Sequence, residues 1–154
     1  MFELLRSLDH KLARLNVYAP TALRAALGVV FVAHAYGKAA VFTFPGTEAF
    51  FTANGFPAWT VYPVFAAELL GGLALLAGFR VRAVALALLP VMFGAIVPHA
   101  GNGWLFSSNG GGWEYPAFLV VALVVQAILG PGAFAFDPAS AKSDAARGAL
   151  VRAS

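Results

Sequence analysis

The chain has 154 residues, of which 60% are hydrophobic and 11% are charged, and its mean hydropathy is +0.79. Because an average soluble domain is about 45 to 50% apolar and about 25% charged, this composition excludes an ordinary water-soluble fold and indicates a single domain, residues 1–154, with lipid as its solvent. The net charge of +3 comes from scattered basic residues that form no stripe for nucleic acid, and the absence of cysteine excludes disulfides and thiolate chemistry.

The first predicted element is an amphipathic helix at the N-terminus. Apolar residues recur there at spacings of three and four, with charged residues between them: Phe2, Leu5, Leu8, Leu12 and Leu15. The pattern is typical of a helix that lies in the cytoplasmic membrane interface. An ordinary solvated lead-in helix fits the same pattern equally well.

Four apolar runs follow, at about residues 20–42, 60–79, 83–99 and 113–131. A hydrocarbon core about 30 Å thick needs roughly 20 helical residues, and the last two runs are near the lower end of that range. Pro90 is expected to kink the third run, and Pro131-Gly132 to end the fourth. The predicted fold is an all-α membrane protein, an antiparallel bundle of four transmembrane helices, followed by a polar tail at 137–154.

The distribution of Lys and Arg predicts how this bundle is oriented. Eight of these residues lie beside the runs on one side, and Lys38 lies on the other; the eight are Arg6, Lys11, Arg14, Arg80, Arg82, Lys142, Arg147 and Arg152. Positive residues concentrate on the cytoplasmic side of membrane proteins, so both termini are predicted to be cytoplasmic. The outer loop 43–59 carries a short helix pattern, with Thr47 as its N-cap and Gly55 past its end.

Six ionisable residues lie within or at the ends of the runs: Arg24, His34, Lys38, Glu68, His99 and Glu114. A charge at mid-membrane costs about 2.5 to 3.5 kcal/mol on insertion scales, so each needs a partner or a wet cavity. At about 1.5 Å per helical residue, all of them except Arg24 lie in the outer half of the bundle. They predict one ligand-binding site, lined by His34, Lys38, Glu68, His99 and Glu114. Glu68 and His34 lie deepest and are the candidate catalytic residues.

Other interpretations of these polar residues remain open. The cluster can be a hydrogen-bond network that ties the helices together without a ligand. Haem between His34 and His99, or a metal on the imidazoles and carboxylates, has no spacing signature, so no metal is assigned. Lys38 and Glu114 can be boundary anchors, and Arg24 is expected to snorkel to the interface. Gly71 and Gly72 are expected to let a neighbouring backbone approach beneath Glu68.

Several segments of the chain, from residue 23 to residue 137, match a known pattern. They are LRAALGVVFVAHAYGKAAVF (23–42), NGFP (54–57), AAELLGGLALLAGF (66–79), the region of His99, and GGWEYPAFLVVALV (111–124). In these segments the chain resembles the DoxX family of small four-helix membrane proteins, grouped with DoxD and more distantly with the methylamine-utilisation protein MauE. The resemblance puts the family's polar positions on His34, Lys38, Glu68, His99 and Glu114.

The resemblance implies a bacterial cytoplasmic-membrane protein associated with redox systems. DoxD-type relatives are tied to thiosulfate:quinone oxidoreductase, and some DoxX proteins to complexes that handle oxidative and thiol stress. The leading hypothesis is therefore a membrane subunit of a quinone-linked redox system, whose polar cluster binds a quinone or a similar small ligand. His34, Lys38 and Glu68 can supply the hydrogen-bond donors and the proton route that a quinone needs.

Whether the chain is itself an enzyme stays open, because it has no thiol and no recognisable cofactor motif. Electrons would then come from a redox partner protein. The alternative function is a non-catalytic assembly subunit whose outer loops recruit another protein. Transport of a small solute or proton is a third hypothesis, although four spans make a narrow bundle. Gly71, Gly72 and Gly78 leave a homo-oligomer undecided.

Overall fold

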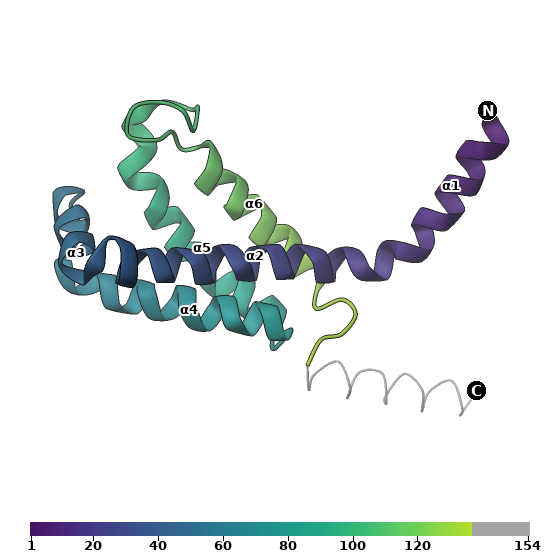
Figure 1. The fold of residues 1–154 in the computed structure, drawn as a ribbon, viewed down its shortest axis with the longest axis horizontal. Helices are drawn as coiled ribbons and strands as arrows, with labels where there is room; N and C mark the ends of the chain where they lie inside the picture. The colour runs from purple at the N-terminus through teal and green to yellow at the C-terminus, as the bar shows by residue number, and fades with distance from the viewer. Residues whose placement is uncertain (137–154) are drawn as a thin grey trace.

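The computed structural model describes residues 1–136, and every regular element within them is helical (Figure 1). The predicted polar tail, 137–154, lies outside the described residues. The elements in chain order are α1 (Phe2–Leu15), a 3-10 turn (Asn16–Tyr18), α2 (Ala19–Tyr36), a π-helical turn (Gly37–Val41), α3 (Thr43–Ala53), a 3-10 turn (Ala58–Thr60), α4 (Val61–Ala77), α5 (Val81–Ile96), a 3-10 segment (Val97–Asn102) and α6 (Glu114–Leu129).

Three helical stretches are long and apolar enough to cross a membrane: Asn16–Val41, Ala58–Ala77 and Val81–Asn102. They confirm the first three predicted runs as apolar helices. The fourth run forms α6, an apolar helix of 16 residues, which at about 1.5 Å per residue is roughly 24 Å long. The chain is therefore a membrane protein built from several apolar helices, and α6 is shorter than each of the three long stretches.

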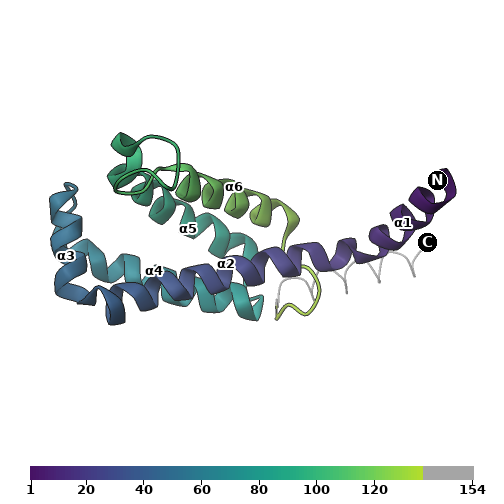
Figure 2. The ribbon, with the colours of Figure 1, turned by 45° about the horizontal axis from the view of Figure 1, so that its top comes forward.

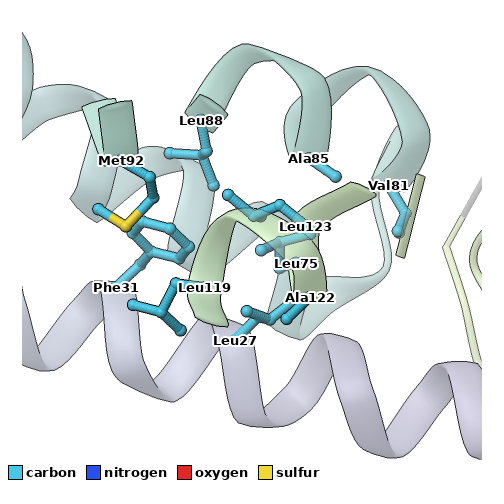
Figure 3. Close-up of a cluster of buried hydrophobic side chains, with 10 residues drawn as sticks. All are labelled: Leu27, Phe31, Leu75, Val81, Ala85, Leu88, Met92, Leu119, Ala122 and Leu123. Carbon is cyan, nitrogen blue, oxygen red and sulfur yellow. The ribbon is translucent and has the colours of Figure 1, made fainter. Parts of the chain in front are cut away.

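The helices pack as two pairs, α2 along α4 and α5 along α6. Figures 1 and 2 show that the second pair diverges from the first toward the end at which α3 lies. At the other end the pairs share one apolar core (Figure 3). Its α5 members, Val81, Ala85, Leu88 and Met92, recur at spacings of four and three, so they form one stripe on the helix. The core thus fills one half of the bundle and ends near Met92.

The α2–α4 pair is held close by two glycines. A Cβ on Gly28 would lie 2.8 Å from the carbonyl oxygen of Gly72, and a Cβ on Gly72 would lie 2.9 Å from that of Gly28. Neither position has room for a side chain, so the two backbones approach as the sequence predicted for Gly72. Gly71 instead faces Leu88 of α5, at 2.9 Å from a Cβ, and Gly78 faces Ala135 at 2.6 Å. All of these glycines pack against the chain itself.

The end opposite α3 gathers three parts of the chain. Gly78, at φ +72°, ends α4 with a Schellman turn, in which Phe79 N–H donates to Ala74 O at 2.9 Å. The segment after α6 folds back, so that Ala133 N–H donates to Val17 O and Phe136 N–H donates to Ala77 O, each at 3.2 Å. The start of α2, the end of α4 and the chain after α6 therefore lie together.

The short helix in loop 43–59 is present, but its predicted start is wrong. Helix α3 begins at Thr43 rather than after Thr47, because the chain turns after the π-helical turn, at Phe42 and Thr43, where Thr43 has φ +62°. Thr47 is therefore inside the helix, where its buried hydroxyl donates to Thr43 O at 2.9 Å and to Lys38 O at 3.2 Å. Gly55, at φ +84°, follows the end of α3 as predicted.

Candidate functional site

An ion pair joins α4 to the end of α2. Lys38 Nζ donates to both carboxylate oxygens of Glu68, each at 2.8 Å. Glu68 lies on α4, four residues before Gly72, so the close approach of the two helices brings its carboxylate against α2. Among the described residues this is the only salt bridge. The predicted meeting of Lys38 and Glu68 is therefore seen in the structure.

Lys38 is carried by the π-helical turn, closed by a hydrogen bond from Phe42 N–H to Gly37 O at 2.8 Å. A π turn places one extra residue in the helix and rotates the side chains that follow, and such turns recur at functional sites. The Thr47 hydroxyl on Lys38 O ties this turn to α3. The backbone that presents the ammonium group is thus braced from two sides.

The two partners are buried to different extents. The Glu68 side chain is 2% exposed, whereas the Lys38 side chain is 16% exposed. A carboxylate withdrawn this far from water needs a charged or hydrogen-bonding partner. Lys38 supplies it, and one of its three N–H donors remains after the two bonds to Glu68.

The ion pair borders a cavity of about 850 Å³ at the end where the helix pairs diverge. This volume lies within the usual range of small-molecule sites, about 300 to 1,000 Å³. All helices from α2 to α6 contribute to its wall. Polar groups are few among many apolar ones; they belong to His34, Lys38, Thr47, Asn54, Thr60, Glu68, His99 and Tyr115. Four of the five predicted site residues thus border one space.

His99 enters the cavity wall from the 3-10 segment after α5. Its Nδ1 lies 3.1 Å from the carbonyl oxygens of both Gly110 and Gly111. Because two carbonyl oxygens can only accept, Nδ1 carries the hydrogen, and in the neutral ring Nε2 is left as an acceptor. The glycine-rich loop 101–112 therefore orients this imidazole.

His34 lies on α2, one turn before Lys38. Its ring stacks on that of Tyr115 at the start of α6, with centroids 6.3 Å apart and planes 22° apart. This contact bridges α2 and α6 where the two helices separate. Tyr115 was not among the candidate site residues predicted from the sequence, so its place in the cavity wall was missed.

Glu114 is the predicted site residue that does not join the others. Its Oε1 accepts the backbone N–H of Phe106 at 2.6 Å, which holds loop 101–112 against the start of α6. It borders a separate, open hollow of about 890 Å³, here called the α6 groove, lined by Trp104, Phe106, Trp113, Glu114, Tyr115, Ala117, Phe118 and Val121. Depth had placed Glu114 correctly at the end of the bundle, but on α6 it points away from the cavity.

The sequence had suggested that Arg24 snorkels to the interface, and this expectation is wrong. Its side chain is 3% exposed, and its guanidinium donates to five backbone carbonyls at 2.7 to 3.1 Å. The acceptors are Leu75 and Leu76 in the last turn of α4, and Pro131, Ala133 and Phe134 after α6. A cation at a helix C-terminus is favourable, and here it also fixes the segment that follows α6. Arg24 is a structural clamp far from the cavity.

The described residues contain no group of three or more His, Cys, Asp or Glu side chains that could hold a metal ion. The polar groups of the cavity instead suit an uncharged ligand that accepts hydrogen bonds, since Lys38 retains an N–H and the cavity is otherwise largely apolar.

Comparison with known proteins gives one finding. The model of the DoxX family matches residues 19–101, a stretch that holds His34, Lys38, Glu68 and His99. Comparisons with curated proteins and with solved structures returned no match. The family match covers more than half of the 154 residues, and the chain therefore belongs to the DoxX family.

Proposed function

We propose that this protein is the membrane subunit of a quinone-linked redox system in the bacterial cytoplasmic membrane, and that its cavity binds the head group of a quinone. The observation that carries the proposal is the Lys38–Glu68 pair at the wall of a largely apolar cavity of about 850 Å³. A quinone head group is flat, uncharged and apolar except for two carbonyl oxygens. Such a ligand suits a wall with few polar groups.

The residues of the cavity have distinct roles in this proposal. The remaining N–H of Lys38 donates to one quinone carbonyl, and the ring of His34 donates to the other. Reduction adds two electrons and two protons to the quinone and gives the quinol. In this proposal a redox partner protein supplies the electrons. Lys38 gives one proton to the oxygen that it bonds and is reprotonated from water. His34 gives the other from one ring nitrogen as its second nitrogen takes up a proton from water, and the Glu68 carboxylate holds Lys38 in place.

The membrane arrangement in this proposal has four spans with both termini cytoplasmic. The hydrogen bond from Ala133 N–H to Val17 O supports an even number of crossings, because it joins the chain after α6 to the chain before α2. Arg80, in the turn between α4 and α5, and Arg82, in the first turn of α5, lie at the same end, and positive residues mark the cytoplasmic side. The cavity then opens in the outer half of the membrane.

Quinone titration of the purified protein in lipid nanodiscs tests the proposal. We expect saturable quenching of tryptophan fluorescence and a raised melting temperature. Glu68→Gln should weaken binding about tenfold, because it removes the charge that fixes Lys38 (~1.4 kcal/mol). Glu48→Gln is the matched control, since Glu48 lies on α3 outside the cavity wall and accepts from Tyr62 Oη at 2.6 Å. Absence of any response in the unmodified protein would refute the proposal.

A second function, a non-catalytic assembly subunit, is favoured by one observation. The Lys38–Glu68 pair joins α2 to α4, the two helices with the most extensive contact, so it has a structural role whatever else it does. If joining α2 to α4 is the only role of the pair, Glu68→Gln lowers the melting temperature. Quinone affinity, and quinone-dependent turnover of the protein purified with its redox partner, then stay unchanged.

A further inference from the structure

The cavity and the α6 groove share one residue of their walls, Tyr115. At about 100° per residue, Leu119 lies about 40° from Tyr115 on one side of α6, and Phe118 lies about 60° away on the other. Leu119 borders the cavity and Phe118 borders the groove. Tyr115 is therefore the boundary between an inner, partly polar space and an outer, apolar one.

The α6 groove has the character of a site for an apolar chain. Phe118 and Val121, along its floor, are 65% and 60% exposed on the outside of the helix. Trp104 and Trp113 line its end at the start of α6 as an edge-to-face pair with ring centroids 4.5 Å apart. Its one carboxylate, on Glu114, is engaged by the N–H of Phe106. The groove thus offers no free charge to a polar ligand.

The ring of Tyr115, which stacks on that of His34, borders both spaces where α2 and α6 diverge. Rotation of an exposed aromatic side chain is fast and local, so this boundary can open without movement of the helices. An amphiphile can then occupy both spaces at once, with its polar end inside and its apolar end along α6.

We propose that the ligand is a lipoquinone whose isoprenoid tail lies in the α6 groove, while its head group lies in the cavity beside Lys38 and Glu68. The assignment rests on the proposed function and narrows it, because it selects a long-tailed, membrane-resident quinone over a short, water-soluble one. Tyr115 positions the first part of the tail as it leaves the cavity. The ligand reaches the site sideways from the bilayer between α2 and α6.

The test compares two quinones with the same head group, one bearing a single isoprene unit and one bearing several, on the full chain in nanodiscs. Val121→Phe fills the groove floor. It should raise the Kd of the long-tailed quinone about tenfold (~1.4 kcal/mol) and leave that of the short one within about twofold. Val125→Phe is the control, since Val125 is exposed one turn further along α6 and borders neither space. It should change neither Kd.

The possible outcomes distinguish the tail site in the α6 groove from the proposed head-group site in the cavity. If the unmodified protein binds neither quinone, the proposed function and the tail site both fail. If both quinones bind but Val121→Phe weakens neither, or weakens both equally, the tail site is refuted and the head-group site survives. Should Val121→Phe fail to fold, Ala117→Phe fills the same groove one turn earlier on α6, and the same comparison of the two quinones tests the tail site.

Discussion

Replacing Lys38 and replacing Glu68 should lower the free energy of unfolding by different amounts, because the two side chains are buried to different extents. Lys38→Met leaves a carboxylate that is 2% exposed without a cationic partner, and breaking a buried pair in this way costs about 3 to 5 kcal/mol of unfolding free energy. Glu68→Gln keeps an amide oxygen that accepts from the lysine, which is 16% exposed. We expect that variant to lose only about 1 to 2 kcal/mol.

The double variant Lys38→Met/Glu68→Gln should be more stable than the sum of the two single losses implies, by about 2 kcal/mol, because no buried charge is left without a partner. The assay is reversible unfolding by SDS titration in mixed micelles, followed by helical circular dichroism. Glu48→Gln, which removes a charge from an exposed hydrogen bond, should change stability by no more than about 0.5 kcal/mol. Strict additivity of the single losses, or a Lys38→Met loss as small as that of the control, would refute the reasoning.

The remaining predictions concern packing and the chain end, and the same titration measures them. Arg24→Lys should lower the free energy of unfolding by about 3 kcal/mol, since an ammonium group has three donors for five carbonyls. The control Arg82→Lys, which affects two hydrogen bonds at an exposed position, should lower it by under about 1 kcal/mol. Equal losses in the two variants would contradict the role of Arg24 as a clamp. Gly72→Ala should cost about 1 to 3 kcal/mol, because its Cβ would meet Gly28 O, and a neutral result would disprove the close approach. Gly94→Ala, with nothing within 4 Å of the added Cβ, should instead stabilise by about 0.5 to 1 kcal/mol.

Hydropathy predicted the helices well because lipid imposes one strong rule, that a spanning segment is apolar and helical. The first three runs match apolar helices to within a few residues at most ends. The start of α3 was wrong because the N-cap pattern assumes a break in the chain before the helix. The break lies earlier, at Phe42 and Thr43, where Thr43 has φ +62°, and a threonine gives no sign in the sequence of a left-handed backbone.

The part of the candidate site that depends on how deep each residue lies in the membrane could be predicted from the sequence. Depth along a helix depends only on residue number, so Lys38, Glu68 and His99 were all expected in the outer half of the bundle, and they border one cavity. The direction of a side chain around the helix also depends on packing, which is why Glu114 was expected in the cavity and lies outside it. Arg24 was misjudged for another reason, since all its acceptors are backbone carbonyls that no residue pattern reveals.

The clamp formed by Arg24 has a consequence for how the protein is made. Two of its acceptors are synthesised 51 and 52 residues after it, but the other three only 107 to 110 residues after it. Until the last helix has left the ribosome and inserted, the guanidinium lacks most of its partners. In a polypeptide that ends before α6, Arg24 therefore keeps only part of its hydrogen bonds and the tertiary structure is weaker. Quality-control proteases degrade proteins in such weakly folded states. Synthesis of α6 and of the segment that follows it is thereby coupled to stability.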